Sequence, residues 1–148
     1  MAKDILQITT YESGILQSAT HRLLSRIKTD YLGQYELTAM QWFVIGHVYE
    51  AGETGIRLSE LMKIVDATMP FITTMVTLLE SKGIIHKTSD VKDSRIKIAT
   101  LNPKYRRTVQ KIEKGLKQEL LDRLRDKSQV TEDELQTCIT VMQKITQS

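Results

Sequence analysis

The 148-residue sequence contains one cysteine and two prolines. A single cysteine, Cys138, excludes a disulfide within the chain and fits a reducing compartment. No apolar run approaches the roughly 20 residues that a membrane-spanning helix needs, so we expect no membrane segment. The first residues, MAKDILQITTYESG, place acidic and polar side chains inside their apolar stretch, which makes a poor signal peptide. We therefore expect a cytoplasmic protein.

The sequence also lacks the patterns of an enzyme or a metalloprotein. Its three histidines, His21, His47 and His86, fall in three different predicted elements, without a carboxylate or cysteine at triad or zinc-site spacing. It has no Gly-rich phosphate-binding loop. We therefore expect no enzymatic activity, no metal and no cofactor.

Positive charge is concentrated in one part of the chain. Residues 82–107 hold eight Lys/Arg and two acids, a net charge of +6, while the remainder, with 13 basic and 16 acidic residues, carries −3. Such clustering is typical of a surface that binds phosphates, although a solvated charged face has the same composition.

Residues 1–148 are predicted to form a single domain that begins with helices. Apolar residues recur every three or four positions over 4–31, which predicts one long helix ending near Gly33. Thr38 and Gln41 form a capping box, so a second, buried helix should start there and stop before Gly52. A loop follows, with a short β-bridge expected at Ile56-Arg57.

Residues 58–101 follow the order of a winged helix-turn-helix. A two-turn helix over 58–65 and a turn at Asp66-Ala67 precede a second helix, which Thr68 caps and Gly83 ends. Period-two alternation predicts strands over 84–89 and 95–101, joined by a polar tip. The predicted fold is thus mainly α with a small β-hairpin, and its winged part spans residues 37–101.

Two more helices should complete the chain. Asn102-Pro103 predicts a helix over 103–127, and the capping box Thr131/Glu134 opens a final one. With the first helix they carry more apolar surface than a small winged domain can cover. We therefore expect a homodimer, with helices 4–32 and 103–147 as dimerisation helices. The alternative is a monomer with a compact helical cap.

Four segments, in this order and spacing, resemble the MarR (multiple antibiotic resistance regulator) family. They are Leu37-Thr-Ala-Met-Gln-Trp42, Leu58-Ser-Glu-Leu61, Leu79-Glu-Ser-Lys-Gly-Ile-Ile85 and the wing tip Asp90-Val-Lys-Asp-Ser-Arg95. The resemblance implies a dimer that represses a nearby promoter by binding a pseudo-palindromic site in double-stranded DNA. It also implies recognition helices in successive major grooves, wings in the flanking minor grooves and, in many members, release by a small aromatic or anionic ligand.

If the resemblance holds, Arg95 enters the minor groove and Asp93 orients it, while hydroxyls and lysines contact bases or phosphates. The predicted DNA-binding residues are Thr68, Thr73, Thr74, Thr77, Lys87, Lys92, Asp93, Arg95 and Lys97. The chain departs from the family pattern at Met69, Phe71 and Ser94, where many members carry arginine, threonine and arginine. Without an arginine early in the recognition helix, we expect A·T-rich sites and a larger share of shape readout.

Two further features bear on how the protein is controlled. A ligand pocket is expected between the first helix, the Trp42 helix and the helix that starts at Pro103, with Arg22, Trp42, His47 and Arg57 as candidate lining residues. Cys138 is expected to be buried on the apolar stripe of the last helix, which favours packing over redox sensing. A redox sensor that acts through Cys138 and a winged module that binds proteins instead of DNA are the competing hypotheses.

Overall fold

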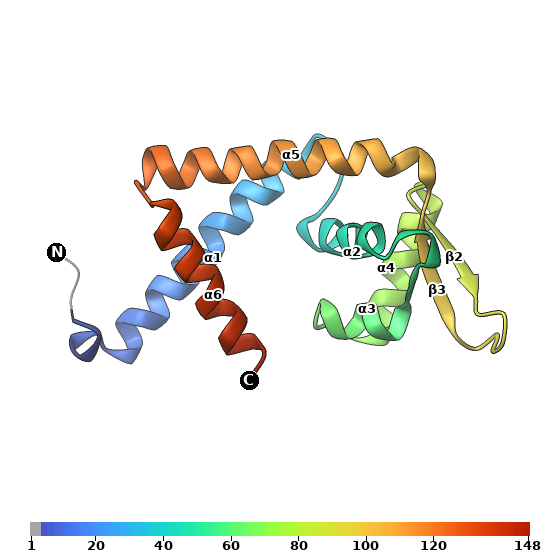
Figure 1. Ribbon diagram of the computed structural model, residues 1–148, viewed down its shortest axis with the longest axis horizontal. Coiled ribbons are helices and arrows are strands. Elements are labelled where there is room, and N and C mark those ends of the chain that lie inside the picture. The colour runs from blue at the N-terminus through green and yellow to red at the C-terminus, as the bar shows by residue number, and fades with distance from the viewer. Residues whose placement is uncertain (1–3) are drawn as a thin grey trace.

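The computed structural model describes residues 4–148, so residues 1–3 of the stretch assessed as a signal peptide lie outside the described residues. The helices are α1 (Thr10–Gly33), α2 (Ala39–Glu50), α3 (Leu58–Ile64), α4 (Met69–Ser81), α5 (Arg106–Asp122) and α6 (Glu132–Thr146). The strands are β1 (Ile56–Arg57), β2 (Ile85–Ser89) and β3 (Lys97–Leu101). Figure 1 shows α5 along one edge of the molecule, with α1 and α6 below one half and the winged part below the other.

The N-terminal helix is shorter than predicted. A 3₁₀ turn at Ile5–Gln7 comes first, and α1 begins only after Thr9, whose backbone is extended. The Thr9 hydroxyl accepts from the Glu12 amide at 3.2 Å, and the Glu12 carboxylate accepts from the Thr9 amide at 3.1 Å. This capping box satisfies amides that a continuous helix would have bonded internally, so the apolar periodicity from residue 4 was misleading here. The helix does end at Gly33, but the left-handed residue beyond it is Glu36, with φ 56°.

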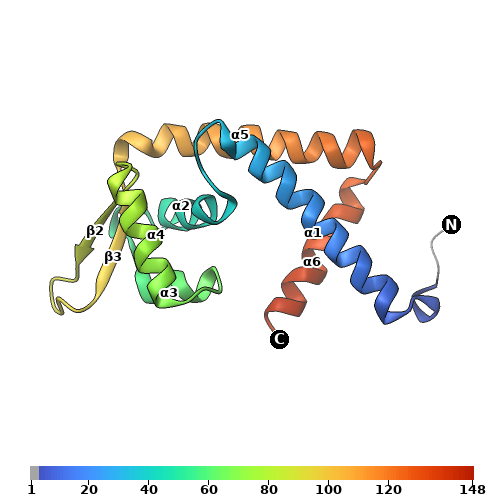
Figure 2. The same ribbon diagram turned by 180° about the vertical axis from the view of Figure 1, so that it is seen from behind.

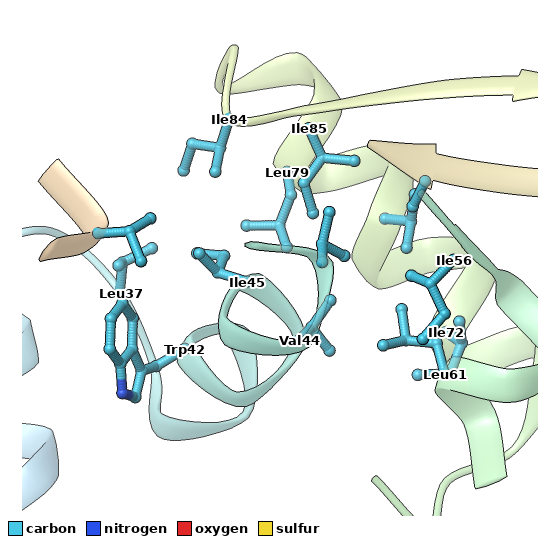
Figure 3. Packing of buried hydrophobic residues seen from close by; sticks show 14 of the residues in the cluster. Leu37, Trp42, Val44, Ile45, Ile56, Leu61, Ile72, Leu79, Ile84 and Ile85 are labelled. Carbon is cyan, nitrogen blue, oxygen red and sulfur yellow. The ribbon is translucent and has the colours of Figure 1, made fainter. Parts of the chain in front are cut away.

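Helix α2 forms the centre of the core. Its predicted capping box is confirmed, since Thr38 and Gln41 exchange hydrogen bonds of 3.0 and 3.2 Å. Figure 3 shows two groups of apolar side chains around this helix. Leu79, Ile84 and Ile85 gather near Ile45, and Ile56, Leu61 and Ile72 lie on the side of Val44. Burial is not all round as predicted, because the Phe43 ring stays 39% exposed beneath the Lys28 ammonium.

The helix-turn-helix is confirmed with nearly the predicted boundaries. Asp66 adopts φ 52° between α3 and α4, and the Thr68 hydroxyl accepts from the Phe71 amide at 3.4 Å. Ile72, Val76 and Leu79 of α4 are fully buried. Each contributes roughly 1.5–3 kcal/mol when it leaves water, so this one face fixes the rotation of α4 against the core.

The hairpin is confirmed and gains a third strand. The sheet order is β1-β3-β2, all antiparallel, and the expected bridge pairs Ile56 with Ala99 and Arg57 with Ile98. Gly83 ends the preceding helix segment at φ 74° as predicted. Strands β2 and β3 are one and two residues shorter at their starts than predicted, because the Ile84 amide donates to the Leu79 carbonyl of α4 and the Ile96 amide donates to the Asp93 carbonyl of the wing tip.

The long helix predicted over 103–127 is divided into three parts. A 3₁₀ turn at Pro103–Tyr105 precedes α5, and a π-helical turn at Arg123–Lys127 follows it. The Asn102 side chain caps the first turn by accepting from the Lys104 amide at 3.1 Å. Val109, Ile112 and Leu116 are buried. The predicted capping box at the start of α6 is also present.

Large apolar faces of α1 and α6 remain uncovered within one chain. The exposed side chains are Tyr11, Ile15, Leu16, Ile139, Val141, Met142 and Ile145, and Ile145 reaches 68% exposure. Cys138 is also exposed on α6 within one chain, contrary to the expected burial. In residues 4–148 no single helix is long and apolar enough to cross a membrane, although α3 and α4, bent by 110°, meet that criterion as a pair on length and composition.

Gly55 holds β1 against β3 through a conformation that only glycine adopts easily. Its backbone lies at φ 77° and ψ −175°, and a Cβ there would sit 2.6 Å from the Ala99 carbonyl oxygen. Gly55→Ala should therefore lower the free energy of unfolding by more than the roughly 1–3 kcal/mol of backbone strain alone. Gly52→Ala is the matched control, since Gly52 has φ 64° but no neighbouring atom within 4 Å, and should cost roughly 1–2 kcal/mol. Urea unfolding of both variants checks this, and equal losses would contradict it.

Candidate nucleic-acid interface

The exposed side of α4 carries hydroxyl groups. With Ile72, Val76 and Leu79 inward, the side chains of Thr73, Thr74 and Thr77 are exposed. Thr68 is exposed as well, although its hydroxyl already caps the helix. Three exposed threonines are unfavourable for an isolated helix, since β-branching restricts their side chains. Their placement on one side of a rigid helix suits polar contacts to a partner.

The wing is bonded directly to α4. The Lys87 ammonium donates to the Thr77 hydroxyl at 3.2 Å, and the Lys87 amide donates to the Glu80 carboxylate at 2.9 Å. Figure 2 shows α4 and the hairpin side by side. These bonds fix the predicted phosphate contact Lys87 beside the predicted helix contact Thr77, so the two elements present one surface.

Acidic side chains shape the wing tip. The Asp90 carboxylate accepts from the amides of Lys92 and Asp93 at 2.8 and 3.3 Å. Asp93 accepts from the Arg95 amide at 3.0 Å and, in a two-pronged contact, from Nε and Nη2 of the Arg95 side chain at 3.1 Å each. These bonds hold the pKa of the Asp93 carboxyl below its usual range, and the hydrogen bond from the Arg95 side chain has the largest effect. Asp93 therefore stays charged at neutral pH and orients Arg95, whose side chain is 89% exposed.

A basic hollow of about 440 Å³ lies between the first part of α4 and the wing. Its lining residues are Arg57, Leu58, Ser59, Met69, Thr73, Lys87, Arg95, Ile96 and Lys97. Four cations and none of the described acidic residues line it, so its potential is positive. The hollow brings together four residues predicted from the sequence to contact DNA: Thr73, Lys87, Arg95 and Lys97.

More of the predicted contacts lie around this basic hollow. The Lys97 ammonium donates to the Ser89 hydroxyl at 2.8 Å, which holds it along the hairpin. Lys92 and Asp93 line a neighbouring hollow of about 540 Å³ at the wing tip. The sequence-based prediction missed Ser59 and Met69, and it placed Arg57 in a ligand pocket instead. The bridge expected at Ile56-Arg57 was the available signal, because pairing with β3 brings Arg57 to the base of the wing.

The C-terminal end of α4 is tied to both connections that lead to α1 and α5. The Lys82 ammonium donates to the Glu36 carbonyl at 2.8 Å, and the Asn102 side chain donates to the Gly83 carbonyl at 2.8 Å. The Asn102 amide also donates to the Ile84 carbonyl at 2.9 Å. The position of α4 is thus coupled to the helices outside the winged part.

The four candidate ligand residues do not form one pocket. Trp42 is buried and lines two hollows, one of about 590 Å³ between α2 and α5 and one of about 420 Å³ beside α1, α2, α5 and α6. Arg57 lies in the basic hollow, and the side chains of Arg22 and His47 are exposed. A hollow does exist at the predicted junction of helices, but of the four candidates it includes only Trp42.

No group of three or more His, Cys, Asp or Glu side chains in residues 4–148 is placed to hold a metal ion. The free thiol of Cys138 is exposed on α6, away from the basic hollow and its lining residues. The polar groups of the basic hollow and of the exposed side of α4 are hydroxyls and cations.

Comparisons with known proteins agree with this geometry. The MarR family model matches residues 37–97. Similar solved structures include a MarR variant from E. coli complexed with operator DNA, at TM-score 0.78 and 23% identity over 89% of this chain and 91% of that chain. The S. aureus MepR–DNA complex is similar at TM-score 0.72 and 22% identity, over 95% and 98%. A MarR family transcriptional regulator from Rhodococcus sp. RHA1 reaches TM-score 0.83 at 16% identity, over 94% and 95%.

A comparison with curated protein sequences finds no match. The solved structures share less than 25% identity with this chain, so they establish the shared fold, and the family model adds the identity of the winged part. The winged part, residues 37–97, thus matches the MarR family, and the fold along most of the chain is that of the solved MarR structures.

Proposed function

We propose that this protein is a MarR-type DNA-binding transcriptional regulator: a homodimeric repressor that binds a pseudo-palindromic operator near its own gene and is released by a small aromatic or anionic ligand. The observation that carries this proposal is the single surface formed by the hydroxyl side of α4 and the cations Arg57, Lys87, Arg95 and Lys97. A surface of this charge attracts the phosphates of duplex DNA, and its hydroxyls suit base edges and phosphates.

Each part of this surface has a distinct proposed role. Helix α4 enters the major groove, where Thr73, Thr74 and Thr77 contact base edges or phosphates. Arg95 reaches the minor groove, where the negative potential is strongest in narrow A·T-rich segments. Asp93 holds the Arg95 guanidinium in place before binding, so less side-chain freedom is lost on the DNA. Lys87, Lys92 and Lys97 neutralise phosphates, and the Thr68 hydroxyl supports the end of the helix.

The proposed dimer covers the exposed faces of α1 and α6. In one chain Leu16, Met142 and Ile145 are 62%, 53% and 68% exposed, as part of a larger apolar surface. Contiguous patches of this kind on a monomer are costly in water and mark association surfaces. A two-fold axis between the helices of 4–32 and 103–147 would bury them and space two copies of the winged part, 37–101, along DNA.

The proposed ligand site is the hollow of about 420 Å³ beside α1, α2, α5 and α6. Its exposed lining is mostly apolar, with Trp42, Phe43 and several leucines. Lys28, Lys117 and Glu113 also line it, and Glu113 pairs with Lys117 at 3.3 Å, which leaves Lys28 as the cation for an anionic group. That combination suits a flat aromatic body with an anionic group. Because the hollow borders the dimerisation helices and α2 together, an occupant there would shift the two winged parts relative to each other.

DNA binding is tested by titrating the full chain with the intergenic DNA upstream of its gene and with a scrambled duplex of equal length. Specific affinity should exceed non-specific affinity by a factor of roughly 10³ or more and fall steeply with salt. Arg95→Ala should weaken specific binding by roughly tenfold or more and relax specificity. Lys97→Ala should weaken both duplexes alike and reduce the salt slope by about 1.

Lys127→Ala is the control for these substitutions, because Lys127 lies in the turn after α5 and should leave affinity unchanged. Equal affinity for the two duplexes would contradict the proposal and favour a winged module that binds proteins.

The dimer is tested by sedimentation equilibrium of the wild type and of Met142→Glu. The wild type should be a dimer, and the variant should dissociate at a concentration at least tenfold higher, because a buried unpaired carboxylate is strongly destabilising. In the wild type the Cys138 thiol should react slowly with a thiol reagent, since the partner would cover that side of α6, and it should react fast in the variant. Val91→Glu, at a fully exposed apolar residue of the wing tip, should remain dimeric. A monomeric wild type with a fast thiol would indicate a compact monomer.

A further inference from the structure

We propose that Phe71 is a specificity-determining residue of this regulator and that its ring contacts the 5-methyl group of a thymine in the major groove. This inference rests on the proposed DNA binding. The proposal pairs one apolar side chain of α4 with one chemical group of the operator, the thymine methyl.

The position of Phe71 follows from the buried face of α4. Phe71 is the third residue of the helix, and its side chain is 42% exposed although its neighbour Ile72 is fully buried. At 100° per residue, Phe71 lies one turn before Thr74 on the outward side. Recognition helices contact base edges mainly through their N-terminal residues, and Phe71 is in that first turn.

The surroundings indicate duplex DNA as the occupant of this surface. Met69, in the same turn and 37% exposed, lines the basic hollow together with Thr73, Lys87 and Arg95. Within residues 4–148, no acidic side chain lines that hollow. Met69 is thus bordered by cations, and Phe71 lies in the same turn of the helix, an arrangement that complements base edges bordered by phosphates.

The composition of α4 restricts what it can read. The helix, MPFITTMVTLLES, contains no Arg, Lys, Asn or Gln. The helix therefore cannot make the bidentate contacts by which Arg or Lys recognises guanine and Asn or Gln recognises adenine. Its one carboxylate, Glu80, already accepts from the Lys87 amide. Threonine methyls and the Phe71 ring remain, and both groups recognise the thymine methyl.

Phe71 is better suited to this role than the other exposed apolar residues of the helix. Its ring has only two side-chain torsions, so little freedom is lost when it is fixed against a base. Met69 is directed to the hollow beside the wing, and Leu78 is near the opposite end of α4. The Phe71 amide bonds to the Thr68 hydroxyl, which anchors the backbone of this turn.

The test uses an operator selected from random duplex DNA by the full-length protein. Each thymine of one half-site is then replaced in turn by deoxyuridine, which lacks only the 5-methyl group. Wild type should lose about fourfold in affinity at one or two positions, the value of one buried methyl group. Phe71→Ala should bind more weakly than wild type and lose the sensitivity at those same positions, while Phe71→Leu should keep part of it.

Thr74→Ser is the matched control, because it removes a methyl group and keeps the hydroxyl at the position one turn after Phe71. It should leave the Phe71 positions sensitive and affect at most a different thymine. The inference is overturned by a wild type that ignores every deoxyuridine, or by a Phe71→Ala variant that keeps the full pattern. Failure of the wild type to bind any selected duplex would instead refute the proposed function. Circular dichroism and unchanged affinity for scrambled DNA show that the variants are folded.

Discussion

Burial of one face of α4 is the constraint on which the proposed DNA-binding surface depends. Ile72, Val76 and Leu79 are fully enclosed by the core, and turning the helix would expose them at a cost of roughly 1.5–3 kcal/mol each. That rotation determines which side chains point outward, namely Phe71 and the threonines. The Gly83 backbone and the following strand then place the wing against the same helix. The buried face of α4 therefore sets the orientation of both the helix and the wing.

The polar contacts of the wing act on orientation more than on stability. An exposed ion pair such as Asp93–Arg95 contributes little to folding, because water and salt screen it. The pair instead holds the Arg95 side chain extended from the hairpin, and Asp90 holds the backbone of the tip in the same way. Bonds from Lys82 and Asn102 link the end of α4 to the connections toward α1 and α5. A shift in the outer helices would therefore be transmitted to α4, as the proposed control by a ligand requires.

Local signals explain what could be predicted from the sequence. The capping boxes at Thr38 and Thr131, the Gly83 turn and the Asn102 cap are each decided within a few residues, and all four are present in the structure. The break at Thr9 was missed because apolar periodicity continued through it. Arg57 was misplaced because only pairing between β1 and β3, about forty residues apart in sequence, brings it to the wing. Burial of Cys138 was expected from its stripe, yet one chain alone leaves that stripe uncovered.

In the proposed complex, two copies of α4 and the wing contact one duplex. A hydroxyl-radical footprint of the full-length protein on a selected operator tests it most directly. We expect two protected segments related by two-fold symmetry, with centres about one helical turn or a multiple apart, and protection of the minor groove outside each. A footprint confined to one segment, or uniform weak protection along the duplex, would contradict the account.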